Sequence, residues 1–190
     1  GGAYPNACLQ VYDPEAGLVK YIDNINSSAT SIHKMQIGED IAFAVFEGAT
    51  SSEIGIIEFR FDSGLPVYQD LYTNFSDEII TEIRDLDIFQ DSVYITTNKG
   101  IYAGNYKDNL NFSERWVEVY IGTDAIQFLP GDSPLILGNG SIFDLEGEDY
   151  CISFTGDLVH AEREGDKVGI LTREYFHEIS DCKINSFHIP

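Results

Sequence analysis

The chain has 190 residues, of which 43% are hydrophobic, and 32 acidic against 11 basic residues give a formal net charge of −21. A chain of this length can bury one sizeable core, so a single domain over residues 1–190 is expected. Its negative surface would repel nucleic acid phosphates and anionic lipid headgroups, which argues against both as partners.

The N-terminal sequence, Gly1-Gly2-Ala3-Tyr4-Pro5, lacks the charged and apolar regions of a signal peptide. No run reaches the roughly 18 apolar residues that a membrane span needs. The chain is therefore interpreted as a mature domain or an excised fragment.

Short runs rich in Val, Ile, Tyr and Phe follow one another along the chain, and most end at Gly, Asp or Asn. Such runs are typical of antiparallel strands. The predicted strands span residues 9–12, 18–22, 31–36, 41–46, 55–59, 86–89, 92–97, 100–104, 115–120, 125–129, 134–137, 141–145, 158–163, 168–172 and 184–189. Helical periodicity is nearly absent, and segment 77–83, rich in β-branched residues, is interpreted as a strand entry. The sequence predicts an all-β protein.

Residues 86–120 form the clearest unit, with four successive predicted strands. Gln90-Asp91 and Asn98-Lys99 are short polar connections, and Gly100 can supply the positive φ that a tight turn may demand. Four antiparallel strands in about 35 residues are typical of one blade of a β-propeller.

Weaker copies of this unit flank it over residues 31–59 and 125–145. The Gly-Ile steps at Gly55 and Gly100 and the Gly-Ser-Ile step at Gly140 are separated by 45 and 40 residues, which suits the spacing of blades. Residues 9–22 resemble the last strands of an incomplete blade, and residues 158–189 a compressed fourth copy.

The repeats thus predict about four blades of four-stranded antiparallel sheets. The chain is either a complete small propeller, closed by pairing of its terminal strands, or part of a larger one. In the second case its blade edges are exposed, capped by a partner or paired in a homodimer.

The stretch Ser92–Tyr102, followed by Trp116–Tyr120, resembles the repeat of the two-component-regulator propeller proteins. It is also similar to the propellers of type IX secretion-associated surface proteins. In those repeats a Thr-x-x-Gly turn follows the second strand and a Trp opens the fourth, as Thr97, Gly100 and Trp116 do here. The resemblance implies an extracytoplasmic propeller that scaffolds or senses a protein or glycan and has no catalytic centre of its own.

Two groups of residues are candidates for ligand binding. Asp85 and Asp87, two apart on a strand, would share one face and could bind Ca²⁺ or act as acid and base, unless they form a solvated strand end. Alternation places Trp116 with Glu118 and Tyr120 on one strand face, either as a recognition platform for a sugar or protein or as a packed position between blades.

Other features carry weaker signals. The acidic segment 144–149 is a further candidate for Ca²⁺ but lacks the EF-hand spacing, and no other metal, cofactor or catalytic residue is predicted. Cys8, Cys151 and Cys182 have no metal-binding spacing. Either a Cys8–Cys182 disulfide joins the two ends, or all three are small buried residues in a reducing compartment. His177, beside Glu178, is predicted to be a surface histidine rather than an acid–base group.

The leading functional hypothesis is a non-enzymatic binding or scaffold propeller, periplasmic or on the cell surface, that engages a protein or glycan. N-x-S/T sequons at Asn26, Asn74, Asn111 and Asn139 favour export slightly. One alternative is a carbohydrate hydrolase or lyase that uses Asp85 and Asp87. Another is a structural fragment of a larger propeller protein.

Overall fold

The computed structural model describes residues 9–13, 15, 17–22, 29–48, 50, 53–145, 153–180 and 183–189. Its strands are β1 (Leu9–Asp13), β2 (Gly17–Ile22), β3 (Ala29–Ile37), β4 (Ile41–Gly48), β5 (Ile54–Asp62), β6 (Leu65–Tyr72), β7 (Ile83–Phe89), β8 (Ser92–Thr97), β9 (Gly100–Asn105), β10 (Trp116–Ile121), β11 (Gln127–Leu129), β12 (Leu135–Leu137), β13 (Ile142–Phe143), β14 (Leu158–Glu164), β15 (Lys167–Thr172), β16 (Tyr175–Ser180) and β17 (Lys183–His188). One 3₁₀ turn, η1 (Ser113–Arg115), precedes β10. None of the described residues belongs to a helix long and apolar enough to cross a bilayer.

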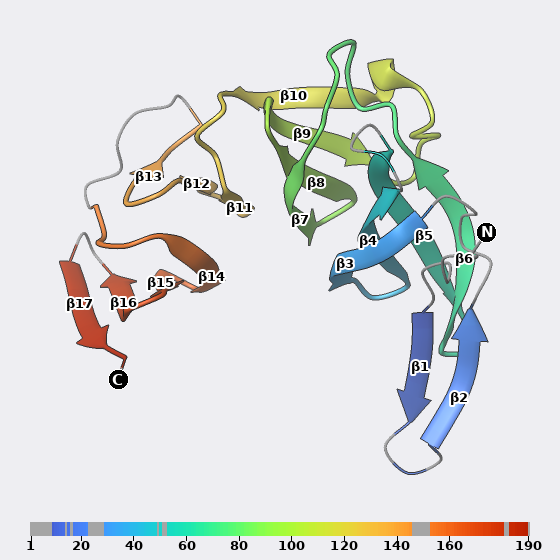
Figure 1. The fold of residues 1–190 in the computed structure, drawn as a ribbon, viewed down its shortest axis with the longest axis horizontal. Helices are drawn as coiled ribbons and strands as arrows, with labels where there is room; N and C mark the ends of the chain where they lie inside the picture. Colours follow the sequence, from blue (N-terminus) through green and yellow to red (C-terminus); the bar gives the residue numbers. More distant parts are fainter. Residues whose placement is uncertain are drawn as a thin grey trace.

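The strands form five antiparallel sheets in chain order. The N-terminal hairpin is β1–β2, the first sheet is β3–β6, the second is β7–β10, the third is β11–β13 and the fourth is β14–β17. Figure 1 shows these sheets following one another round an arc, with β3, β7, β11 and β14 innermost. Neighbouring inner strands contact each other, β3 with β7, β7 with β11 and β11 with β14. The all-β propeller architecture predicted from the repeats is confirmed.

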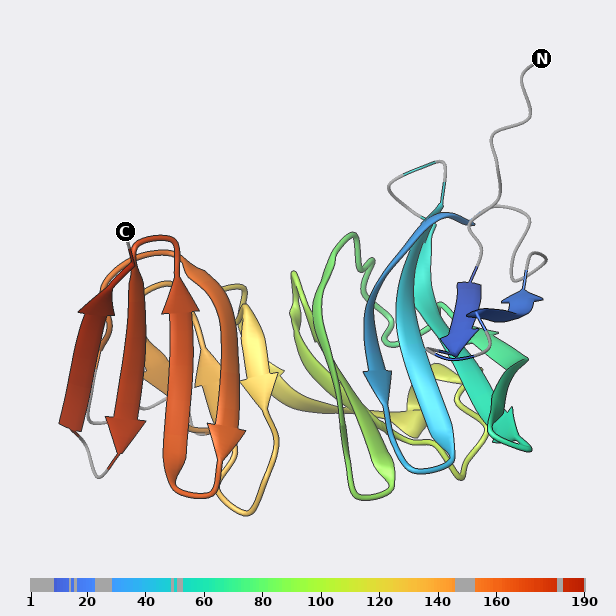
Figure 2. The same ribbon diagram turned by 90° about the horizontal axis from the view of Figure 1, so that it is seen from below.

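The arc is open. Its two ends, the N-terminal hairpin and β17, lie apart in Figure 1, and Figure 2 shows the fourth sheet and the hairpin at opposite ends of the molecule. Within the described residues, β17 pairs with β16 alone and the hairpin strands pair only with each other. The described strands therefore form part of a propeller ring, and they do not close it by pairing.

Strand β4 shows why the sheets stack. Ile41, Phe43 and Val45 pack in the core between the first and second sheets, while Ala42, Ala44 and Phe46 pack on the opposite face. All six side chains are buried, which explains the uninterrupted apolar run in the sequence.

The same packing recurs along the arc. Ile101, Phe128 and Ile136 pack between the second and third sheets. Leu137, Val168 and Ile170 pack between the third and fourth. The fourth sheet is covered on this inner face only. On its other face Leu171, Phe176 and Phe187 are exposed.

Some details differ from the sequence prediction. Strands β6 and β16 were not predicted, because their apolar and polar residues do not alternate and most of their side chains are only partly buried or exposed. The third sheet, not the fourth, is the short one among the described residues, with three strands. Residues 75–82 are irregular, and the expected strand entry occurs at Ile83.

Gly100 does not have a positive φ, so that part of the turn prediction is wrong. It is needed for a different reason, because a Cβ there would collide with the carbonyl oxygen of Tyr120. Gly55 is in the same situation against the carbonyl of Tyr72. Both glycines begin or nearly begin the third strand of a sheet and lie against its fourth strand, which explains the repeated Gly-Ile step.

Candidate ligand-binding site

Three of the four inner strands contain a β-bulge near the axis of the arc. Apart from Thr30 at the start of β3, three residues are left without a partner: Lys34 in β3, Arg84 in β7 and Val159 in β14. A bulge turns a side chain away from the regular alternation and is common beside functional sites. Lys34 also has φ of 47°, which is uncommon for a residue other than glycine.

All three bulged residues line one cavity of 720 Å³, here called the axial cavity. Its walls come from β3, β7, the segment before β11, the β12–β13 turn and the start of β14, so all four larger sheets contribute. The described lining residues are His33, Lys34, Glu47, Glu82, Ile83, Arg84, Thr123, Asp124, Ile126, Asn139, Ser141, Leu158 and Val159. A concave site of this size with convergent polar groups is typical of a binding pocket.

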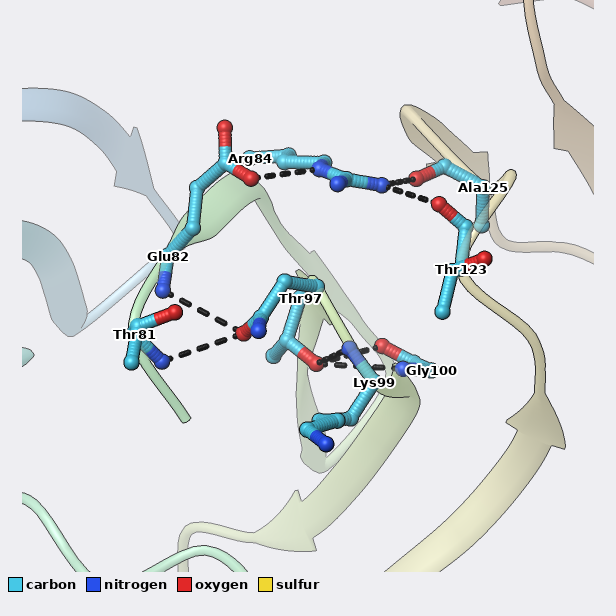
Figure 3. Close-up of polar contacts among 9 residues, drawn as sticks. Thr81, Glu82, Arg84, Thr97, Lys99, Gly100, Thr123 and Ala125 are labelled. Atoms are coloured by element: carbon cyan, nitrogen blue, oxygen red, sulfur yellow. Dashed lines mark hydrogen bonds and ion pairs between the residues drawn. The ribbon is translucent and has the colours of Figure 1, made fainter. Parts of the chain in front are cut away.

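Arg84 fixes one wall of the axial cavity. Figure 3 shows its guanidinium between the Glu82 carboxylate, 2.9 Å from Nε, and the carbonyl oxygens of Thr123 and Ala125. The two carbonyls accept from Nη1 at 2.6 and 2.9 Å. Arg84 therefore ties the second sheet to the segment that enters the third, and its charge is already engaged.

Lys34 is also a lining residue, and it pairs with a buried carboxylate. Its Nζ lies 3.6 Å from Asp85 Oδ1, with the lysine side chain 45% and the aspartate side chain 13% exposed. Burial raises the pKa of Asp85 to about 6, although the Lys34 ammonium and the backbone N–H groups of Leu86 and Phe128 act to lower it. Asp85 thus lies where β3, β7 and β11 meet.

Asp87 is two residues further along β7 and is half-buried. Burial raises its pKa, while the backbone N–H of Ile88, which donates to Oδ1 at 2.7 Å, and the charge of His160 lower it. The two predicted carboxylates therefore lie together on an inner strand at the axis. Neither is part of a solvated strand end.

Trp116 lies in the core between the first and second sheets. Its Nε1 donates to the Leu110 carbonyl at 3.0 Å, and its ring meets Phe75 edge to face at 4.8 Å between centroids. The ring is 6% exposed. This is the packed position that alternation offered as one of its two interpretations.

Tyr120 is not on the Trp116 face, so the predicted alternation is wrong here. The pairing of β10 with β9 skips a residue between Glu118 and Tyr120, and this bulge turns Tyr120 to the other side of the sheet. Tyr120 packs between the second and third sheets, and its hydroxyl donates to Asp124 at 3.1 Å. The four predicted site residues therefore lie in three places.

His177 is buried, contrary to the surface position predicted for it. Its Nε2 lies 3.0 Å from the Thr155 carbonyl, which can only accept a hydrogen bond, and its Nδ1 lies 2.8 Å from Ser186 Oγ. Both ring nitrogens have structural partners, so the residue cross-links the fourth sheet.

Several predictions lie outside the described residues. These are the three cysteines with their disulfide and nearly all of the acidic segment 144–149. Across the part of the chain that is described, no three His, Cys, Asp or Glu side chains are grouped to hold a metal ion.

Lys34 and Arg84, the cationic side chains of the cavity, were not singled out from the sequence. The available signal was a basic residue in the first strand of two successive copies. Period-two alternation cannot register a bulge, so it does not show where such a residue points.

Comparison with known proteins places this arrangement among β-propellers. No family model and no curated protein matches the chain. Among solved structures, it is similar to PorZ, a surface component of the type IX secretion system of Porphyromonas gingivalis, with 16% identity and a TM-score of 0.63. The match covers 96% of this chain and 24% of that one.

Two further structures show the same fold. The extracellular domain of the one-component system BT4673 of B. thetaiotaomicron matches with 14% identity and a TM-score of 0.59, over 95% of this chain and 24% of that one. The AfRom2 CNH domain matches with 8% identity and a TM-score of 0.58, over 90% of this chain and 56% of that one. The chain thus spans between a quarter and somewhat over half of these structures, and at such identities the likeness shows the fold alone.

Proposed function

We propose that the chain is a non-enzymatic protein-binding module that receives a segment of a partner protein in the axial cavity. The observation that carries the proposal is the cavity itself, 720 Å³ in volume, with three inner-strand bulges directed at it. Backbone irregularity repeated at one place on separate strands is typical of a site rather than of a packing region.

The chemistry of the lining favours protein over glycan. No Trp, Tyr or Phe is among the described residues of the cavity, so no large aromatic ring is offered on which a sugar could stack. The lining instead combines carboxylates, amide and hydroxyl groups with Ile83, Ile126 and Leu158, which suits mixed polar and apolar peptide side chains.

The proposal includes a location outside the cytoplasm, in the periplasm or on the cell surface. It is supported by the resemblance of Ser92–Tyr120 to extracytoplasmic propeller repeats. The fold shared with a bacterial surface component and with an extracellular domain agrees with it.

A peptide selection tests the proposed site. Val159 is a bulged lining residue that is 55% exposed, so Val159→Arg would fill the cavity without disturbing a core. Val117→Arg is the matched control, because Val117 is 64% exposed on β10 and is not part of the cavity lining. Phage-displayed peptides selected on the unmodified chain should bind the Val117 variant equally and the Val159 variant at least ten-fold more weakly. Equal binding to both variants would refute the axial site.

A further inference from the structure

The Lys34–Asp85 ion pair lies at the wall of the axial cavity. It connects the partly exposed ammonium of Lys34 to the buried carboxylate of Asp85. Lys34 lines the cavity, whereas Asp85 lies behind it and is not among the lining residues. The bulge at Lys34 holds the ammonium within 3.6 Å of the Asp85 carboxylate. Any change in the charge of Asp85 therefore alters the charge that the cavity presents.

Resting on the function proposed above, we propose that the axial cavity holds a basic segment of its partner at neutral pH and releases it on acidification through the Lys34–Asp85 pair.

The charges at the cavity favour a basic segment. Arg84 is held by Glu82 and two carbonyls, and Lys34 by Asp85. Among the other described lining residues, the ionisable groups are the carboxylates of Glu47 and Asp124 and the imidazole of His33, which lies 3.9 Å from Glu47. The excess is negative, and the net charge of −21 steers cations toward it.

Acidification reverses this balance. With its pKa raised to about 6 by burial, Asp85 takes up a proton between pH 7 and 5 and no longer neutralises Lys34. The Lys34 ammonium then repels a basic ligand at close range. Burial and the charge of Asp87 on β7 favour this uptake, whereas Lys34 on β3 and the backbone N–H groups of Leu86 and Phe128 oppose it. The residue paired opposite Asp85 on β8 is the uncharged Thr96.

The first arm of the test needs no ligand. A ¹³C-carboxyl NMR titration of the free chain, with the Asp85 signal assigned by its loss in Asp85→Asn, should show a midpoint near 6. Because the ammonium lowers the pKa of Asp85, Lys34→Met should raise this midpoint. Lys107→Met is the matched control, since Lys107 pairs with Asp91 at the far end of β7 and should leave the midpoint unchanged. An Asp85 midpoint near the ordinary value of 3.8, or one that does not change in Lys34→Met, would overturn the proposed release.

The second arm measures binding of a fluorescein-labelled (Arg-Gly)₅ peptide by anisotropy at pH 7.5 and pH 5. The unmodified chain should lose about ten-fold in affinity on acidification. Asp85→Asn should bind at pH 7.5 as weakly as the unmodified chain does at pH 5, and should lose most of the pH dependence. A full ten-fold fall retained in Asp85→Asn would overturn the role of the pair.

The two arms separate the two proposals. Peptide binding that Val159→Arg does not weaken at any pH would refute the axial site itself, whatever the NMR titration gives. A normal Asp85 midpoint together with cavity-dependent peptide binding would leave the axial site standing and refute its control by Asp85.

Discussion

Asp85 is a carboxylate placed where ionisation is unfavourable. It is 9% exposed, its position at the junction of three inner strands removes most of its hydration, and the single ammonium at 3.6 Å does not restore it. Its pKa of about 6 exceeds the ordinary value of 3.8, so the folded chain binds this proton more tightly than the unfolded chain does.

The stabilising contribution of the Asp85 proton is complete below pH 3.8 and is lost as the pH rises through 6. A difference of about 2 between the two pKa values corresponds to about 3 kcal/mol at neutral pH. This difference already includes the attraction to Lys34, so we expect Asp85→Asn to gain up to about 3 kcal/mol at pH 7.5.

Urea unfolding at several pH values measures the effect. The advantage of Asp85→Asn over the unmodified chain should shrink as the pH falls through 6 and vanish below pH 3.8. Asp132→Asn, in the exposed turn before β12, is the matched control and should change the stability little. A loss of stability in Asp85→Asn at pH 7.5 would contradict the expectation.

Among individual residues, the sequence predicted some of those at the axis but not their environment. It singled out Asp85 and Asp87 as paired on one strand, and they do lie together. It did not indicate that Asp85 is buried or that Lys34 reaches it, because both depend on bulges and on contacts between sheets. Tyr120 shows the same limit, since one skipped residue in β10 moves its ring to the other face.

At the scale of elements, the turn between the second and third strands recurs with a hydroxyl at its start. Thr97 Oγ1 donates to the Gly100 carbonyl at 2.9 Å and accepts from the Lys99 and Gly100 N–H groups (Figure 3). Thr172 Oγ1 makes the corresponding bonds to the carbonyl and N–H of Tyr175 in the fourth sheet. The fourth sheet therefore keeps the threonine of the Thr-x-x-Gly turn but has Tyr175 in place of the glycine.

Alanine substitutions of the third-strand glycines should cost more stability than one at a glycine in open space. Gly55→Ala and Gly100→Ala should each destabilise the fold by about 2–3 kcal/mol, because the new methyl group meets a carbonyl oxygen of the fourth strand. Gly64→Ala, where φ is +80° but the space is open, should cost about 1 kcal/mol. Thermal unfolding monitored by circular dichroism ranks the three variants, and equal losses would show that the close approach is not what these glycines serve.

Strand positions were predictable wherever both faces of a strand are buried. Strands β4 and β8 were located almost to the residue because their apolar runs are continuous or strictly ordered. Strands β6 and β16 escaped prediction because their apolar and polar residues do not alternate. These two strands, one in the first sheet and one in the fourth, therefore came only from the structure.

At the scale of the whole molecule, the outer face of the fourth sheet differs from all the other sheet faces. Leu171, Phe176 and Phe187 form a cross-strand row on it, and the two phenylalanine rings lie 6.3 Å apart. Charged side chains, including Glu162, Lys167 and Glu178, surround a hollow of 630 Å³ beside this row. The other three larger sheets pack on both faces.

We expect this face to pair with its counterpart on a second copy at high concentration. Two chains of charge −21 repel each other, so association should increase with salt, which screens the repulsion. Sedimentation equilibrium at 0.05 and 0.5 M NaCl measures it. Phe176→Lys should abolish the association, whereas Val67→Lys, at an exposed position on β6, should not. A strictly monomeric chain at both salt concentrations would refute the pairing.

The side chain of Gln127 links the third sheet to the backbone of the fourth. Its Nε2 donates to the Ala161 carbonyl at 2.8 Å, and its Oε1 accepts from the Ala161 N–H at 2.7 Å, so it pairs with β14 as a backbone amide would. A primary amide is the side-chain group that offers a donor and an acceptor at this spacing. Sliding β14 by one residue would present the opposite face of the fourth sheet to the third and break both bonds. One glutamine thus encodes the register between successive sheets, as a hairpin turn encodes the register between successive strands.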